Sequence, residues 1–385
     1  MARDRDGNEL NLLIQRPGAR IGRRQALRVA ALLGAAGALN ACSGDTNPAG
    51  GQSAPSTTLD NRPEEKVLNF YNWSDYIDEK TIPNFQKQTG LKVNYDNYSS
   101  NEDLLSKMRA GRTQYDIVVP TNWFVPTYLR LGLIQPIRLD LVPNAKNLDP
   151  TFVKADYDPD GKYTIPWQWG TTGIGYNSSK VPGGTVDSWK SLYQPDPALA
   201  GKMSMLREVT DVIAATLIYL GKDPNSTEDA DMKAVQDTVR GVKSKLKKFT
   251  SDTYIDELTA NETWLAMGWS GDVFQAAAEN DKVKYVIPKE GSLQWADVMC
   301  VPKSAPHPKN AAKFMNYVLE PKVAAQISEY VSYGTPVTAA KQLLPKEQLD
   351  DPSIYPPASI KLHIVTLSGP KIQKWQTTFD GIISG

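Results

Sequence analysis

The sequence is poor in the residues that form disulfide frameworks and transition-metal sites. Its 385 residues include two cysteines, Cys42 and Cys300, and two histidines, His307 and His363. With so few, and with no ligand spacing among them, we expect no disulfide framework, no metal site and no bound cofactor. Cys300 lies in an apolar stretch and should be a small buried hydrophobe. His307 stands between two prolines, and we expect it in a surface loop.

The N-terminal segment also lacks an apolar run long enough to span a bilayer. The uncharged run at 29–39 has 11 residues, whereas a spanning helix needs roughly 20. It follows the letters RRQALR at 23–28 and precedes LNAC at 39–42. We therefore predict that residues 1–41 are a twin-arginine and lipoprotein signal peptide and that Cys42 is lipidated and anchored to the membrane. Asn40 is unusual in such a cleavage box, and the alternative is a free Cys42 thiol.

No surplus of positive charge exists once the signal peptide is removed. The whole chain has 43 basic and 43 acidic residues, but residues 1–41 hold seven arginines against three acids. The remaining chain therefore carries a net charge of about minus four. A mildly acidic protein is suited to a cationic ligand and is unsuited to nucleic acid.

Composition divides the remaining chain into a tether and a folded part. Residues 42–65 contain almost no large apolar side chains, so they cannot offset the entropy lost on folding, and we predict a disordered tether. About 320 residues follow from Lys66 onward. A chain of that length favours two lobes over one continuous core.

The folded part begins with an alternation of strands and helices. Strands are predicted at 67–71, 91–95 and 116–119 with helices between them, and a further helix runs from about 123 to 132. Ser100, with Asp103 three residues later, predicts a helix cap. This order is typical of a mostly parallel sheet. A looser alternation follows, with strands at 203–206, 264–269 and 285–288 and a helix at 208–220.

Large aromatic rings and carboxylates recur where these strands end, which is where open α/β sheets bind ligands. The first lobe contributes Trp73, Ser74, Asp75, Tyr76, Thr121 and Trp123. The second contributes Glu208, Asp211, Trp269 and Asp272, and the strand that follows carries Trp295 and Asp297. A ring face attracts a desolvated ammonium by roughly 2 kcal/mol, and a carboxylate accepts charge-assisted hydrogen bonds from it. The combination predicts a slot for a linear alkyl chain with a positive charge at each end. The alternative is that the rings fill cores and the acids lie at helix starts.

Five motifs in order along residues 66–385 resemble the periplasmic spermidine- and putrescine-binding proteins. They are FYNWSDYI at 70–77, YDIVVP at 115–120, TTGIGYN at 171–177, GWSGDVFQA at 268–276 and IPKEG at 287–291. The resemblance implies an α/β, two-lobed, type II clamshell fold with the ligand cleft between the lobes. Lobe 1 would contain residues 66–172 and 297–341, and lobe 2 would contain residues 173–296 and 342–385.

The resemblance also implies a function and a set of ligand contacts. The protein would be a periplasmic, monomeric polyamine-binding protein that delivers its ligand to the permease subunits of an ABC importer. The strand-end residues named above would contact the ligand, and Tyr333 would close over it. Asp272 and the segments YLGKDPN at 219–225 and YPPA at 355–358 resemble the putrescine-binding branch, whereas Trp295 resembles the spermidine-binding branch. We therefore favour putrescine, with spermidine as the alternative.

Two other functions remain open from the sequence. The same clamshell could bind another small cationic or neutral solute. A secreted hydrolase could use paired carboxylates such as Glu208 and Asp211. We expect no enzyme, because GWSGD at 268–272 lacks the last glycine of a nucleophile elbow and neither histidine lies in a catalytic pattern.

Overall fold

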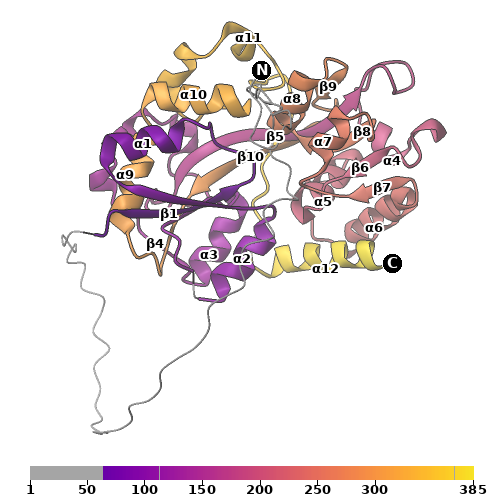
Figure 1. Ribbon diagram of the computed structural model, residues 1–385. Coiled ribbons are helices and arrows are strands. Elements are labelled where there is room, and N and C mark those ends of the chain that lie inside the picture. Colours follow the sequence, from indigo (N-terminus) through magenta and orange to yellow (C-terminus); the bar gives the residue numbers. More distant parts are fainter. Residues whose placement is uncertain (1–63, 112, 368) are drawn as a thin grey trace, which may run out of the picture. The chain divides into compact units, whose positions relative to one another are not determined.

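The structure is a computed structural model that describes residues 64–111, 113–367 and 369–385 (Figure 1). The predicted signal peptide, Cys42 and nearly all of the predicted tether lie outside these residues. In the described part of the chain, no helix combines the length and the apolar character needed to cross a bilayer.

A three-stranded parallel sheet forms the core of the first lobe. The strands β1 (Val67–Trp73), β2 (Lys92–Tyr98) and β3 (Ile117–Val118) lie in the order β2-β1-β3. The helices α1 (Thr81–Thr89) and α2 (Asn101–Arg109) connect them, which confirms the predicted alternation. Gly90 ends α1 with a positive φ of 70°, a conformation that glycine adopts without strain. The predicted Ser100 cap is also confirmed, because its hydroxyl accepts a hydrogen bond from the Asp103 backbone N–H at 3.1 Å.

A seven-stranded mixed sheet forms the core of the second lobe, in the order β12-β10-β5-β8-β6-β7, with β9 also paired to β5. Its strands are β5 (Ile165–Asn177), β6 (Met203–Met205), β7 (Leu246–Phe249), β8 (Leu265–Trp269), β9 (Val283–Val286), β10 (Ser292–Met299) and β12 (Leu362–His363). The strand β6 is parallel to β7 and β8, but β5 is antiparallel to β8, β9 and β10. The predicted strands are present within two residues of their expected bounds.

The long strands β5 and β10 run side by side and join the two lobes (Figure 1). Beyond β10 the chain continues into β11 (Val301–Pro302), which pairs with β4 (Ile134–Gln135). Two bridges tie this end to the first lobe, one between Val118 and Cys300 and one between Thr121 and Asp297. The architecture is the two-lobed α/β clamshell that the sequence predicts.

Helices cover both sheets. The other α-helices are α3 (Val125–Arg130), α4 (Lys190–Tyr193), α5 (Val209–Tyr219), α6 (Asp229–Lys243), α7 (Tyr254–Thr259), α8 (Ser270–Glu279), α9 (Pro308–Val318), α10 (Pro321–Val331), α11 (Lys346–Leu349) and α12 (Pro370–Ser384). The 3-10 helices are η1 (Asn122–Phe124), η2 (Leu139–Leu141), η3 (Pro143–Asn147), η4 (Pro150–Phe152), η5 (Pro197–Leu199) and η6 (Thr338–Leu343).

The C-terminal helix α12 lies against α5 and α6 in the second lobe (Figure 1). Trp375 of α12 is fully buried, and its indole N–H donates to the Ser226 carbonyl at 2.8 Å. Because α5 is apolar on almost every face, α12 is one of the elements that remove it from water.

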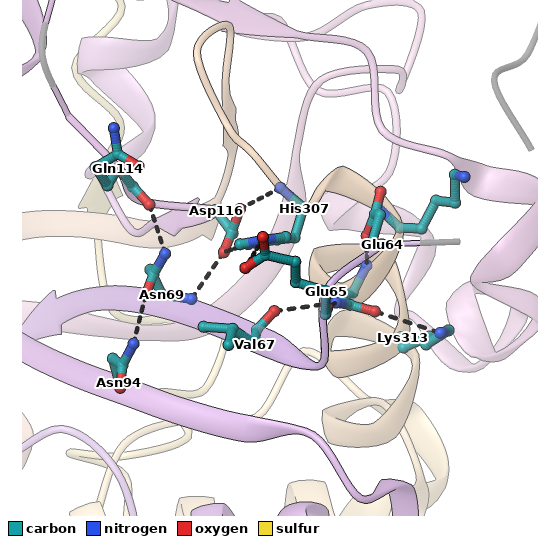
Figure 2. Close-up of polar contacts among 11 residues, drawn as sticks. Glu64, Glu65, Val67, Asn69, Asn94, Gln114, Asp116, His307 and Lys313 are labelled. Atoms are coloured by element: carbon teal, nitrogen blue, oxygen red, sulfur yellow. Dashed lines mark hydrogen bonds and ion pairs between the residues drawn. The ribbon is translucent and has the colours of Figure 1, made fainter. Parts of the chain in front are cut away.

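The start of the described chain is tied to the first lobe (Figure 2). The Glu64 carboxylate accepts hydrogen bonds from the backbone N–H groups of Lys309 and Asn310 at the start of α9, both at 2.9 Å. The Asn310 side chain donates to the carbonyls of Glu65 and Val67 at 2.7 and 3.0 Å. Glu64 and Glu65, at the end of the predicted tether, therefore contact the folded chain.

The predictions for Cys300 and His307 have different outcomes. Cys300 is free and fully buried, as expected. The surface-loop prediction for His307 is wrong, because the residue is 8% exposed. The Asp116 carboxylate accepts the His307 backbone N–H at 2.6 Å and lies 3.0 Å from its Nδ1 (Figure 2). The two flanking prolines direct the chain into α9, and the buried carboxylate holds the imidazole inside.

Candidate functional site

Five aromatic rings from four separate segments form a continuous wall where the two lobes meet. Trp73 contacts Trp269 with a centroid distance of 6.0 Å, and Trp269 contacts Trp295 at 6.5 Å. Trp295 contacts Tyr333 at 5.4 Å, and Tyr333 contacts Tyr76 at 5.1 Å. All four contacts are edge to face, the arrangement that ring quadrupoles favour. The structure thus brings together rings that lie 260 positions apart in the sequence.

Asp272, in the first turn of α8, is held by two tyrosines. The Tyr254 hydroxyl donates to its Oδ2 at 2.8 Å, and the Tyr333 hydroxyl donates to its Oδ1 at 2.7 Å. Burial raises the pKa of Asp272 to about 6, although these hydrogen bonds oppose the rise. The Tyr333 ring is seated on Gly271, where an added Cβ would lie 2.4 Å from the ring. Glycine is therefore needed at this position for the tyrosine to reach the carboxylate.

Asp211, in the first turn of α5, is bound to the ring wall. The Trp269 indole N–H donates to its Oδ1 at 3.3 Å, and the Thr172 hydroxyl of β5 donates to the same oxygen. The residue is 1% exposed. Burial raises its pKa to about 6, against the effect of the two hydrogen bonds.

Asp297, on β10, lies at the joint between the lobes. The Thr121 hydroxyl of the first lobe donates to its Oδ1 at 2.7 Å, and the Asn101 side-chain amide in turn donates to Thr121 Oγ1 at 3.0 Å. Burial, with the charges of Asp211 and Asp272, raises the pKa of Asp297 to about 7. A register shift follows Asp297 on β10, and such bulges often redirect a side chain at a functional site.

Glu208, immediately before α5, is the least satisfied of the four acids. It is 3% exposed, and its Oε1 has no hydrogen-bond partner within the described residues. It makes no side-chain cap to α5. Burial raises its pKa well above the usual range, and the nearby charges of Glu102 and Asp211 add to the rise.

Within the part of the chain that the structure describes, no lysine, arginine or histidine forms an ion pair with any of these four carboxylates. Buried carboxylates that repel one another and have no cation cost free energy unless they take up protons. Their raised pKa values show that cost. A ligand with several ammonium groups would remove it and would lay its methylenes against the rings.

Three predicted site residues are placed less directly. Asp75 is exposed and adopts a positive φ of 53°, and its charge contributes to the raised pKa of Asp272. Ser74 is half-buried. Trp123 is buried, but no ring contact joins it to the five-ring wall in the described residues, and its indole N–H has no partner there.

Sequence reasoning missed the donors that orient the carboxylates. Thr172 belongs to the TTGIGYN motif, but nothing in its spacing indicates that its hydroxyl reaches Asp211. Tyr254 lies 18 positions before Asp272 and carries no sequence signal at all. Gly271 could have been found, because a glycine between a serine and an acid at a helix start is a sign of close packing.

Among the described residues, no group of three or more histidine, cysteine, aspartate and glutamate side chains is arranged to hold a metal ion. The tyrosine that shields Asp272 and the tryptophan that contacts Asp211 instead place rings beside the acids. Rings beside buried carboxylates are an arrangement that can take up an organic cation.

Comparison with known proteins gives a family match and several similar sequences. Residues 80–356 match the family described as bacterial extracellular solute-binding protein. The chain is 40% identical over 333 residues to the putrescine-binding periplasmic protein PotF of Escherichia coli, covering 82% of this chain and 90% of that protein. It is 33% identical over 296 residues to the spermidine/putrescine-binding periplasmic protein of Escherichia coli, covering 77% and 84%.

A solved structure extends the similarity to three dimensions. The spermidine/putrescine ABC transporter substrate-binding protein PotD of Streptococcus pneumoniae aligns with a TM-score of 0.71 at 29% identity. The alignment covers 83% of this chain and 98% of that one.

Proposed function

Since this chain belongs to the bacterial extracellular solute-binding proteins, we propose that it captures putrescine or spermidine outside the cytoplasm and delivers it to the permease of an ABC importer. Its similarity to proteins named for putrescine and spermidine binding supports the choice of ligand. Proteins of this family bind and hand over solutes, and we propose that this chain catalyses no reaction.

The observation that carries the proposal is a set of buried carboxylates beside the ring wall that, among the described residues, form no ion pair with a basic side chain. Asp211, Asp272 and Asp297 lie beside the five linked rings, and among the described residues no basic side chain forms an ion pair with them. Burial raises their pKa values to about 6, 6 and 7. A diamine would supply two positive charges and an apolar stem. An anionic or neutral solute would leave these charges uncompensated.

The ligand contacts that we propose are the thirteen residues that the sequence singles out. Ten of them are the five rings, the four buried acids and Thr121. Asp75 acts through its charge on Asp272, and Ser74 and Trp123 are retained from the resemblance alone. We also propose the lobe ranges 66–172 with 297–341 and 173–296 with 342–385, because β5 and β10 belong to the seven-stranded sheet and the bridges from Thr121 to Asp297 and from Val118 to Cys300 join the end of β10 to the first lobe. Closure of the lobes would exclude water from the charges and so strengthen their attraction.

Export and anchoring form a further part of the proposal. The letters RRQALR and LNAC support twin-arginine export, cleavage after residue 41 and lipidation of Cys42. The protein would then act as a monomer on the outer face of the cytoplasmic membrane. Labelling of the expressed protein with a radioactive fatty acid tests this step, and a Cys42→Ser variant that incorporates as much label as the wild type would contradict it.

A thermal-shift screen tests the proposed ligand. We expect putrescine and spermidine to raise the melting temperature of the purified mature protein, because a ligand that binds only the folded state stabilises it by mass action. Cadaverine, glutamate and glucose serve as comparison solutes. A shift with glutamate or glucose and none with either polyamine would overturn the proposal.

A further inference from the structure

A cavity of about 430 Å³ lies outside the ring wall, between the first turn of α2 and the second lobe. Its volume falls within the range of small-molecule sites. Residues of both lobes line it. They are Ser99, Ser100, Glu102, Asp103, Arg207, Glu208, Val209, Phe249, Thr250, Ser251, Asp252, Gln376, Phe379, Asp380 and Ile383. We refer to this space as the outer cavity.

Glu208 connects the outer cavity to the ring-walled site. Its side chain is 97% buried and lines the cavity, and its Oε1 has no hydrogen-bond partner in the described residues. The charges of Asp211 and Asp297, which belong to the ring-walled site, raise its pKa further. A buried acceptor without a donor is uncommon in folded proteins and indicates that a group absent from the protein completes it.

The other acids of the outer cavity come from three segments. Glu102 and Asp103 lie on α2, Asp252 follows β7, and Asp380 lies on α12. Asp103, Asp252 and Asp380 are exposed. Burial, with the charges of Asp211, Asp103 and Asp380, raises the pKa of Glu102 to about 7. The α2 N-terminus favours acids in its first turn, but it does not account for an acid on α12. Asp380 lies near the C-terminal end of α12 and is exposed, and its Oδ1 accepts a hydrogen bond from the Gln376 side-chain amide at 2.9 Å.

The outer cavity also offers apolar surface and little positive charge. Phe249 and Phe379 pack edge to face at 6.1 Å and form part of its lining. Arg207 is the one basic residue in the lining. It is exposed, and among the described residues it forms no ion pair with the acids. Acids around an aromatic surface repeat, on a smaller scale, the chemistry of the ring-walled site.

We propose that the outer cavity is a subsite for an additional ammonium group, so that a triamine spans from Asp272 past Glu208 to Glu102 and Asp380. This inference rests on the proposed polyamine-binding function and extends it. A diamine ends within the ring wall, whereas a triamine carries a third charge into the outer cavity. That charge would contact both lobes and favour closure.

Calorimetric titration of putrescine and spermidine tests the subsite with the double variant Glu102→Gln and Asp380→Asn. The two acids are absent from the ring-walled site, so putrescine affinity should change by less than about threefold. Spermidine affinity should fall at least tenfold. The double variant Asp281→Asn and Asp187→Asn is the control, because it removes two exposed negative charges outside both sites.

The outcomes separate the subsite from the proposed function. A wild-type protein that binds neither polyamine would end the proposed function itself. A wild-type protein that binds putrescine but not spermidine would leave that function intact and overturn the subsite. Equal losses for the two ligands, or the same loss in the control variant, would mean that only net charge matters and would also overturn the subsite.

Discussion

Replacing Asp297 with asparagine should weaken ligand binding and stabilise the ligand-free protein at the same time. Asparagine keeps the shape and the Oδ1 acceptor that the Thr121 hydroxyl uses at 2.7 Å, so the substitution removes mainly the charge. Loss of one partner of a buried charge pair costs about 2 to 5 kcal/mol of binding. This corresponds to a roughly 30-fold to several thousand-fold weaker Kd for putrescine.

The stability effect has the opposite sign. Asp297 is 4% exposed, and burial raises its pKa from 3.8 to about 7. Between pH 3.8 and about 7, the folded state therefore holds a proton that the unfolded state releases. The ionised residue opposes folding by an amount that grows as the pH rises from 3.8 to 7 and is constant above it. Since each pKa unit corresponds to about 1.4 kcal/mol, the ionised Asp297 lowers the free energy of unfolding at pH 8 by an amount on the order of 4 kcal/mol.

Thermal unfolding and calorimetry measure both effects on the same sample. We expect the Asp297→Asn protein, without ligand, to melt at a higher temperature than the wild type at pH 8 and at nearly the same temperature at pH 4. Asp281→Asn, which removes an exposed acid, should change neither property. Unchanged putrescine affinity, or a lower melting temperature at pH 8, would refute the reasoning.

Three further predictions follow from the site and its support. Putrescine affinity should fall as the pH drops from 8 to 5, because the pKa values of Asp211, Asp272 and Asp297 are about 6, 6 and 7 and each carboxyl that must lose a proton weakens binding about tenfold per pH unit below its pKa. Calorimetry in buffers of different ionisation enthalpy should detect proton release on binding. Its absence at pH 6.5 would contradict the assignment. Gly271→Ala should cost about 1 to 3 kcal/mol of stability and weaken ligand binding, because the new Cβ would press on the Tyr333 ring. Gly241→Ala, on an open face of α6, is the control. Equal melting temperatures of the two variants in thermal unfolding would argue against the contact. Ser100→Ala should lower the free energy of unfolding by about 1 kcal/mol, as measured by urea unfolding, because it removes the α2 cap. Ser99→Ala should leave that free energy unchanged. Equal unfolding midpoints for the two variants would show that the cap contributes nothing.

Local signals in the sequence predicted much of the first lobe. The apolar strands, the glycine after α1 and the Ser100 cap each act within a few residues, so their outcome depends little on distant contacts. His307 shows the limit of this reasoning, because a residue flanked by prolines was expected at the surface. Its burial depends on Asp116, which lies 191 positions away.

In the candidate site, too, some features could be predicted from the local sequence and others depend on distant packing. The rings and acids at strand ends were predictable, because parallel strands end at a common edge. The donors to those acids were not, since Tyr254 and Thr172 reach Asp272 and Asp211 through the packing of α7 and β5. The outer cavity was equally hidden, because Asp380 and Glu102 line one space only after α12 packs on α5 and α6.

Calorimetric titration of the mature protein with putrescine and with n-butylamine tests the central claim most directly. The two molecules share a four-carbon stem and differ by one ammonium group. If buried acids at both ends of a ring-walled slot bind the ligand, putrescine should bind at least 100-fold more tightly, about 3 kcal/mol. Equal affinity for the two amines, or no saturable heat with putrescine, would contradict the account.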